Sequence, residues 1–195
     1  MKDMKAMRRR GAALEAAILD AGWEELMERG YSGLTLEAVA KRAGTSRPVL
    51  HRRWPSRLDL AVAAMARYFS LNPVTVPDLG NVGDELILLL RKLSDRGTPV
   101  LIRLMLEMSE DLADARSNFA GLRAQVGRPG LVEEILQRGI ARGEIDPARL
   151  TPRIASLPVD LARHEAMMTL ERLPEPVIRE IVEDIFLPLV SLSPR

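Results

Sequence analysis

Residues 34–60 read LTLEAVAKRAGTSRPVLHRRWPSRLDL, and this stretch decides the fold. Thr35 is a typical helix-capping residue, and a short helix after it would end at Gly44. Ser46 is suited to capping a second short helix. That helix would close at Trp54, because the residue before a proline is pushed out of the α region. Two short helices joined by a tight turn have the proportions of a helix-turn-helix.

The second of these helices is basic and amphipathic. Leu50 and Trp54 are four residues apart and point together into a core, while a different face carries basic side chains. The basic side chains of this helix are Arg47, His51, Arg52 and Arg53. A short helix of this kind suits the DNA major groove, which admits one helix. A solvated basic helix is an equally good interpretation of the same chemistry.

The charge distribution favours a polyanionic partner at one end of the chain. Residues 1–60 hold 12 Lys and Arg against 8 Asp and Glu, whereas residues 61–195 hold 16 against 19. This asymmetry is expected when the basic end meets nucleic acid. A basic arm in residues 1–10 would add phosphate or minor-groove contacts. A disordered tail is the alternative for that arm.

The composition disfavours an enzyme. The chain of 195 residues has no cysteine and two histidines, His51 and His164. Disulfides, thiolate catalysis and cysteine-ligated zinc are therefore excluded, and a histidine metal site is not expected. No phosphate-binding loop or dinucleotide glycine pattern is present. We expect no cofactor and no catalytic residue, although a site built only from carboxylates stays open.

The rest of the chain is expected to be helical, because apolar residues recur at spacings of three and four. A first helix covers 8–29 and stops at Gly30, and Ser56 with Asp59 forms a capping box for a helix through Phe69. After a loop over 72–83, further helices are predicted at 84–95, 99–110, 113–126, 129–142, 152–172 (with a kink at Pro158) and 176–190.

These elements predict an all-α fold of nine or ten helices. Residues 1–60 would form a three-helix DNA-binding domain, and a fourth helix would join it to a helical bundle within residues 61–195. The basic residues 1–10 lack the apolar core of a signal peptide. The longest apolar run, over 86–90, is too short to span a bilayer. We therefore expect a cytoplasmic protein with no membrane partner.

Residues 14–60 resemble the DNA-binding domain of the TetR family of bacterial regulators. The matching positions are Ile18, Leu19, Ala21, Gly30, Tyr31, Leu34, Thr35, Val39, Ala40, Ala43, Gly44, Ser46, Leu50, Trp54, Ser56, Arg57 and Leu60. Residues 99–190 resemble, more loosely, a C-terminal domain of one branch of that family. The matching pieces are Ala141 to Glu144, Asp160-Leu161, Arg163 to Glu165 and Phe186 to Leu189.

The resemblance implies a role for each residue around the turn. Base edges would be faced by Arg47, Pro48, Val49 and Arg52, and the DNA backbone would be contacted by Thr35, His51, Arg53 and Arg57. Ser46 completes the predicted DNA-binding set. The sequence departs from the family at His51, where a tyrosine is usual, and at Arg57, where a lysine is usual. Arg57 keeps the charge and gains bidentate geometry.

The resemblance also implies a homodimer and a small-molecule effector. The dimer would be built by the helices at 152–172 and 176–190, through the apolar residues Leu157, Leu161, Ile178, Ile181, Val182, Ile185, Phe186 and Leu189. The alternative is that these apolar residues pack inside the monomer. The candidate ligand-pocket residues are Met65, Arg103, Met105, Met108, Phe119, His164 and Met168. Each is also compatible with plain core or surface, and their chemistry favours an apolar ligand.

The function that follows is a transcriptional regulator, expected to be a repressor released from a palindromic operator by a small apolar ligand. A helical architectural or protein-interaction module without operator specificity is the alternative. Specific binding to operator DNA would separate the two, because a protein adaptor would show none.

Overall fold

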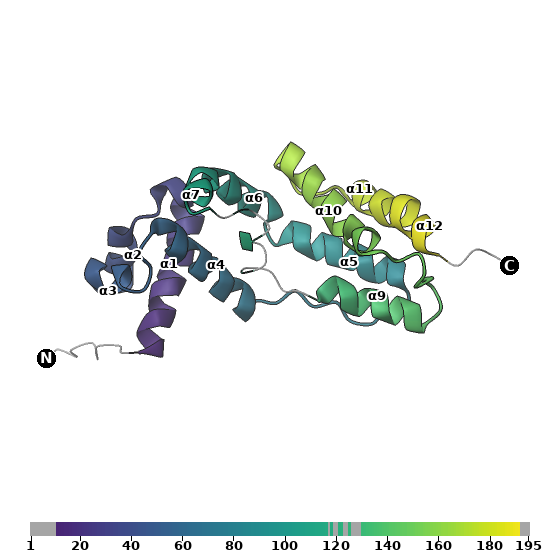
Figure 1. Ribbon diagram of the computed structural model, residues 1–195, viewed down its shortest axis with the longest axis horizontal. Coiled ribbons are helices and arrows are strands. Elements are labelled where there is room, and N and C mark those ends of the chain that lie inside the picture. Colours follow the sequence, from purple (N-terminus) through teal and green to yellow (C-terminus); the bar gives the residue numbers. More distant parts are fainter. Residues whose placement is uncertain (1–10, 117, 119–120, 123–124, 126–129, 192–195) are drawn as a thin grey trace, which may run out of the picture. The chain divides into compact units, whose positions relative to one another are not determined.

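The computed structural model describes residues 11–116, 118, 121–122, 125 and 130–191 (Figure 1). The chain divides into two compact units. The first contains residues 1–72 and 107–127, and the second contains residues 73–106 and 128–195. The predicted division at residue 60 differs from this one, because the helix that begins at Arg57 belongs wholly to the first unit. The predicted basic arm, residues 1–10, lies outside the described residues.

The first unit is a small helical domain. Its described helices are α1 (Ala12–Gly33), α2 (Leu36–Arg42), α3 (Arg47–His51), α4 (Arg57–Leu71) and α7 (Ser109–Asp114). The predicted stop at Gly30 is confirmed as a break in α1, since this residue has φ 70° and ψ −178°, a region open in practice only to glycine. The Thr35 hydroxyl accepts a hydrogen bond from the Ala38 N–H at 3.1 Å and so caps α2.

The start of α4 is also fixed locally. The Ser56 hydroxyl accepts from the backbone N–H of Asp59 at 3.0 Å, and the Asp59 carboxylate accepts from the Ser56 N–H at 3.1 Å. This is the predicted capping box, which satisfies two N–H groups that the helix itself leaves unpaired. Leu60 and Met65 of the same helix are fully buried. The helix is therefore held at both its cap and its apolar face.

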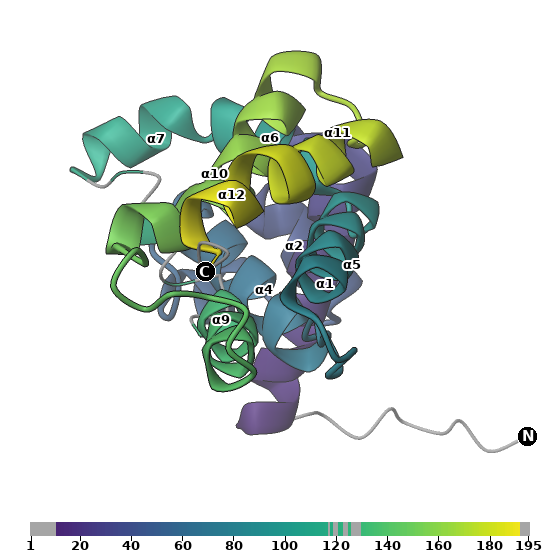
Figure 2. The same cartoon turned by 90° about the vertical axis from the view of Figure 1, so that its right-hand side faces the viewer.

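The second unit is a larger helical bundle. Its described helices are α5 (Val82–Asp95), α6 (Thr98–Glu107, whose last residue belongs to the first unit), α9 (Leu131–Ala141), α10 (Pro152–Thr169), α11 (Glu175–Arg179), the π-helical segment η1 (Glu180–Phe186) and α12 (Leu187–Val190). Figures 1 and 2 show α10 beside the continuous α11–η1–α12 segment. Thr151 caps α10, and Gly143 has φ 75° just after the end of α9. Pro158 lies inside α10 as predicted.

The core of the second unit is apolar and is shared by its long helices. The best-buried members are Leu86, Leu89 and Leu90 from α5, Ile135 and Leu136 from α9, Ala166 from α10, and Val182, Phe186 and Val190 from the last helical segment. Each buried leucine, isoleucine or phenylalanine contributes on the order of 1.5–3 kcal/mol relative to exposure. This core, rather than local propensity, holds the bundle together.

The predicted all-α class is confirmed. Among the described residues there are ten helical segments if α11, η1 and α12 count as one, and the one extended pairing is an isolated bridge between Ile145 and Ser191. Within the described ranges, no helix has the length and apolarity needed to cross a membrane.

Several predicted helix boundaries are wrong. The helix predicted at 152–172 ends at Thr169. The helix after the turn ends at His51 rather than Trp54, because the chain passes through a turn before Pro55. The helices predicted at 99–110 and 113–126 meet earlier, since α6 ends at Glu107 and α7 covers 109–114. Most of 117–129 lies outside the described residues.

Candidate nucleic-acid interface

The two short helices and the turn between them form a rigid unit. Gly44 has φ 66°, and the Thr45 N–H donates to the Ala40 carbonyl at 2.9 Å, which closes the turn. Val39 and Leu50 are fully buried, one from each helix. Because each helix is anchored in the core by such a residue, the outer face of α3 is presented in a fixed orientation.

Most of the predicted DNA-binding residues lie in α3 or directly beside it in the chain. Val49 is half-buried, and the following are exposed: Thr35, Ser46, Pro48, Arg47, His51, Arg52 and Arg53. Ser46 occupies the N-cap position, but its hydroxyl makes no capping hydrogen bond. The reason is local, because Pro48 has no N–H and the Val49 N–H donates to the Ser46 carbonyl at 3.0 Å. The Ser46 hydroxyl is therefore not used in the helix cap.

Two of these arginines are paired with carboxylates in the same unit. Arg47 Nε lies 2.8 Å from Glu37 Oε1, which joins α3 to the first turn of α2. Arg53 forms an ion pair with Glu15 of α1. In the part of the chain that the structure describes, the side chain of Arg52 makes no ion pair or hydrogen bond. Exposed ion pairs of this kind contribute little free energy, so a phosphate or a guanine base could replace the carboxylate with only a small loss.

The α2 helix is fixed to α1 by a cluster of charges. Arg42, in the last turn of α2, donates from Nε to Glu25 Oε1 at 2.8 Å and from Nη1 to Glu28 Oε1 at 2.8 Å. Glu24 accepts from Arg42 Nη1 at 3.1 Å. Glu25 is 2% exposed, so its charge is compensated within the protein. The hydrogen bond from Arg42 is the largest factor that lowers the pKa of Glu28.

Arg57 lies in a different environment from the other predicted contacts. Its guanidinium donates to Asp111 Oδ2 of α7, from Nη2 at 2.9 Å and from Nε at 3.3 Å. Its Cζ also lies 4.2 Å from the centre of the Tyr31 ring. The Tyr31 hydroxyl donates to the same carboxylate oxygen of Asp111. Arg57 is thus half-buried in a three-residue cluster rather than free on the surface.

The cluster shifts the titration of its members. Burial first, and then the hydrogen bond to Asp111, raise the pKa of Tyr31. The hydrogen bonds from Tyr31 and then from Arg57 lower the pKa of Asp111. The Asp111 carboxylate therefore stays ionised at pH values below the range in which an aspartate usually takes up a proton.

A second carboxylate holds the last turn of α1, just after the break at Gly30. Glu107 Oε2 accepts from the backbone N–H of Tyr31 at 2.8 Å and of Ser32 at 3.2 Å. A Cβ on Gly30 would lie 3.1 Å from the same oxygen, so the close approach favours glycine there. Neither Glu107 nor Asp111 was predicted for this role, because they follow Tyr31 by 76 and 80 residues and no local pattern marks them.

The eight residues predicted at the dimer interface fall into two groups, one buried and one at the surface. Four of them are therefore removed from the predicted interface. The buried group is at most 5% exposed in the single chain and so offers almost no surface for a partner to cover. It consists of Ile178, Ile181, Val182 and Phe186. They pack in the core of the second unit. Leu157 and Leu161 are half-buried, and Ile185 and Leu189 are 37% and 44% exposed. These four residues stay as the predicted dimer contacts.

The predicted ligand-pocket residues are spread over both units. Met65 and Met108 are fully buried in the first unit, where they fill its core. In the second unit, Met105 is half-buried and three residues are exposed, namely Arg103, His164 and Met168. Phe119 lies outside the described residues. A hollow of about 460 Å³ on the first unit contains none of them and is lined by Ala13, Ala16, Ala17, Asp20, Ala21, Glu24, Arg42 and Ala43.

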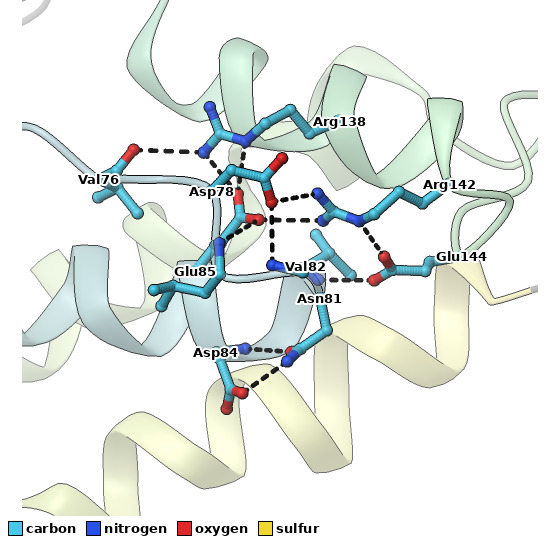
Figure 3. A network of polar contacts seen from close by, with 11 residues as sticks. Val76, Asp78, Asn81, Val82, Asp84, Glu85, Arg138, Arg142 and Glu144 are labelled. Atoms are coloured by element: carbon cyan, nitrogen blue, oxygen red, sulfur yellow. Dashed lines mark hydrogen bonds and ion pairs between the residues drawn. The ribbon is translucent and has the colours of Figure 1, made fainter.

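A buried charge network explains the Arg142-Gly143-Glu144 motif of the second unit (Figure 3). Glu85 of α5 is fully buried and accepts from Arg138 Nε at 2.8 Å. Arg142 Nη2 lies 3.1 Å from the other oxygen of Glu85, and Arg142 Nη1 donates to Asp78 at 2.9 Å. Glu144 accepts from the Val82 N–H at 2.6 Å, at the start of α5. The motif therefore ties α9 and its following turn to α5.

The chain matches two family models that together cover most of it. Residues 18–64 match the model described as bacterial regulatory proteins of the tetR family. Residues 76–185 match the model described as a tetracyclin repressor-like C-terminal domain. The helix-turn-helix with its exposed basic helix thus belongs to the class of DNA-binding transcriptional regulators.

Curated relatives and solved structures agree with these matches. A DNA-binding transcriptional repressor TetR of Mycobacteroides abscessus is 30% identical over 202 residues, covering 95% of this chain and 98% of that protein. An uncharacterized HTH-type transcriptional regulator of Mycobacterium tuberculosis is 27% identical, covering 92% and 89%. The crystal structure of a TetR family transcription regulator has 25% identity and a TM-score of 0.68, covering 89% and 96%. The chain belongs to the TetR family.

Proposed function

We propose that this TetR-family regulator is a repressor that binds a palindromic operator as a homodimer and is released by a small apolar ligand. The observation that carries the proposal is the exposed surface of α3, where Arg47, Pro48 and the C-cap residue Arg52 are exposed and the buried Leu50 anchors the helix. Direct readout requires such fixed side chains, because base edges present donors and acceptors at defined positions. DNA of a bacterial cytoplasm is the partner that this surface fits.

The roles within the face follow from side-chain chemistry. Arg47 and Arg52 are assigned to base edges, where a bidentate contact to guanine O6 and N7 is the commonest specific pairing. Val49 and Pro48 are assigned to apolar contact with thymine methyl groups. Backbone contacts are assigned to Thr35, Ser46, His51, Arg53 and Arg57. These contacts set affinity and register without reading sequence.

Dimerisation is assigned to the outward faces of α10 and of the continuous η1–α12 segment. Ile185 and Leu189 are exposed and lie one turn apart, and Leu157 and Leu161 of α10 are half-buried. Met168 of α10, 67% exposed, is a further apolar residue that a partner would cover. A two-fold dimer presents two copies of α3, so the operator would contain two inverted half-sites about one helical turn apart, or a multiple of it.

Repression is supported by the Mycobacteroides abscessus relative, which is named as a repressor. The test is a reporter gene transcribed through a DNA site selected by the purified protein. Expression of the wild-type chain should lower transcription, whereas the Arg47→Ala variant should not. Increased transcription would make the protein an activator, and no selectable site would favour the architectural alternative.

Release by an apolar ligand is tested on the same DNA. The measurement is the fluorescence anisotropy of the labelled site with bound protein, titrated with uncharged aromatic and aliphatic compounds and with matched charged ones. A fall in anisotropy caused only by apolar compounds would support the proposal. Release by the charged compounds alone would contradict the assigned ligand class.

A further inference from the structure

Arg57 is a predicted backbone contact that a distant residue, Asp111 of α7, holds in place from beyond the helices α1 to α4. Two nitrogens of its guanidinium donate to Asp111 Oδ2, at 2.9 and 3.3 Å, and its Cζ lies over the Tyr31 ring. The three residues come from three elements, namely the last turn of α1, the first residue of α4, and α7. Arg47 and Arg53, in contrast, are paired with carboxylates of α2 and α1.

Asp111 offers Arg57 what a DNA phosphate would offer. Both are anions with oxygens that accept from the planar fork of a guanidinium, and both prefer an edge that presents two N–H groups, of which a guanidinium has two. Asp111 occupies the edge formed by Nε and Nη2. A phosphate that takes this edge must displace the carboxylate. A phosphate that binds elsewhere on the guanidinium lies close to a second negative charge.

Asp111 is held at this position by more than Arg57. Its Oδ2 also accepts from the Tyr31 hydroxyl, and Leu112, the next residue of α7, is 3% exposed. Glu107, one turn earlier, accepts from the N–H groups of Tyr31 and Ser32. Release of Arg57 by a rotation of the Asp111 side chain would therefore break the contact to Tyr31 as well.

We infer that Asp111 competes with the DNA phosphate for Arg57, so that α7 lowers the affinity of the helix-turn-helix for DNA of every sequence. The inference rests on the proposed role of Arg57 as a backbone contact. Phosphate contacts carry no sequence information, so specific and random DNA are affected alike. The competition also reduces the number of counterions that binding releases, which makes the affinity less dependent on salt.

The test compares four variants on a random-sequence duplex over a range of salt concentrations. Asp111→Asn removes the charge and keeps an oxygen that accepts from Tyr31. Glu110→Gln is the matched control, because it makes the same charge change at an exposed neighbouring position of α7. The others are Arg57→Ala and the double variant Asp111→Asn/Arg57→Ala. Thermal unfolding of each variant confirms that it is folded.

Asp111→Asn should bind the duplex roughly twofold to fivefold more tightly, as expected when a weak ion pair no longer opposes binding. Its plot of log affinity against log salt should be steeper by about 0.9, the value for one more phosphate contact. Glu110→Gln should match the wild type, and the double variant should match Arg57→Ala. The inference is overturned if Asp111→Asn binds no more tightly than wild type, or if its gain persists without Arg57.

Random DNA keeps this test separate from the proposed function. It requires neither a palindromic operator nor release by a ligand. A regulator that proves to be an activator, or to use an unpaired half-site, would leave the predicted effect of Asp111→Asn unchanged. Conversely, unchanged binding by Asp111→Asn would leave the reading of the operator by α3 intact.

Discussion

The guanidinium of Arg47 and the carboxylate of Glu37 form an ion pair between the two helices of the helix-turn-helix, with Nε 2.8 Å from Oε1. Both side chains are about 60% exposed, at 63% and 60%, so the pair contributes little to stability. The contact is made at Nε, so the two terminal nitrogens stay available for the proposed bidentate contact to guanine. We therefore expect the pair to matter for the proposed DNA reading rather than for folding.

Arg47→Ala should relax sequence preference. One bidentate contact is worth roughly 1–3 kcal/mol of discrimination between bases. Affinity for a selected site should therefore fall by about that amount more than affinity for random DNA. The measurement is the ratio of the two dissociation constants by fluorescence anisotropy. Arg53→Ala is the matched control, expected to weaken both alike, and an equal loss for Arg47→Ala would refute its base-reading role.

Gly30→Ala should destabilise the first unit. Gly30 combines φ 70° with ψ −178°, and an added Cβ would lie 3.1 Å from Glu107 Oε2. Backbone strain of this kind costs about 1–3 kcal/mol. The free energy of unfolding in urea should fall by that amount, whereas Ser32→Ala, at an exposed neighbour, should change it by less than about 0.5 kcal/mol. An unchanged midpoint for Gly30→Ala would show that the turn relaxes.

Glu85→Gln should destabilise the second unit. Glu85 is fully buried between Arg138 and Arg142, and removal of its charge leaves two guanidinium groups without their central partner. Breaking a buried ion pair costs about 3 kcal/mol, the lower end of the usual range, because both arginines keep some contact with water. Urea unfolding measures the loss, with the exposed Glu133→Gln as the control. Equal stability of the two variants would contradict the structural role of the network.

The stabilising effect of Asp111 should persist into acid. Hydrogen bonds from Tyr31 and then Arg57 lower its pKa in the folded protein, so its contribution is complete above the unfolded value of about 3.9 and is lost as the pH falls through the lower, folded value. The difference in Tm between wild type and Asp111→Asn should stay constant from pH 7 to about 5 and shrink only below about 4. A difference that vanishes already near pH 5 would show that the hydrogen bonds do not hold the carboxylate ionised.

Ile185→Glu should prevent formation of the proposed homodimer. Ile185 is one of the exposed apolar residues of the last helical segment, and a buried charge without a partner is strongly unfavourable in an interface. Sedimentation equilibrium should show a monomer for this variant and a dimer for the wild type. Leu79→Glu, at a comparably exposed leucine in the loop before α5, should leave the dimer unchanged. A dimeric Ile185→Glu would place the interface elsewhere.

Local signals predicted the features of the fold that depend on a few neighbouring residues. Thr35, Ser56 and Thr151 cap helices as expected, and Gly30 breaks α1. The exposed basic face of α3 was also predictable, because Leu50 indicates which side of the helix is buried. Helix propensity, capping and periodicity act within one or two turns, so a sequence displays them directly.

Long-range relationships could not be predicted in the same way. Arg57 was expected at the surface, but Asp111, 54 residues further on, holds it in a cluster. Periodicity identified the apolar positions of the last helix and not their partners, because a stripe that packs in the monomer and one that meets a second copy have the same spacing. Phe186 is buried in the core, while Ile185 beside it is exposed.

The central claim, that α3 reads an operator in a two-fold dimer, is tested most directly by selecting bound sequences from random DNA with the full-length protein. The predicted result is an inverted repeat whose half-sites are about one helical turn apart, or a multiple of it, with at least one guanine position that loses its preference in Arg47→Ala. Enrichment of no sequence, or of a single half-site without an inverted copy, would contradict the claim.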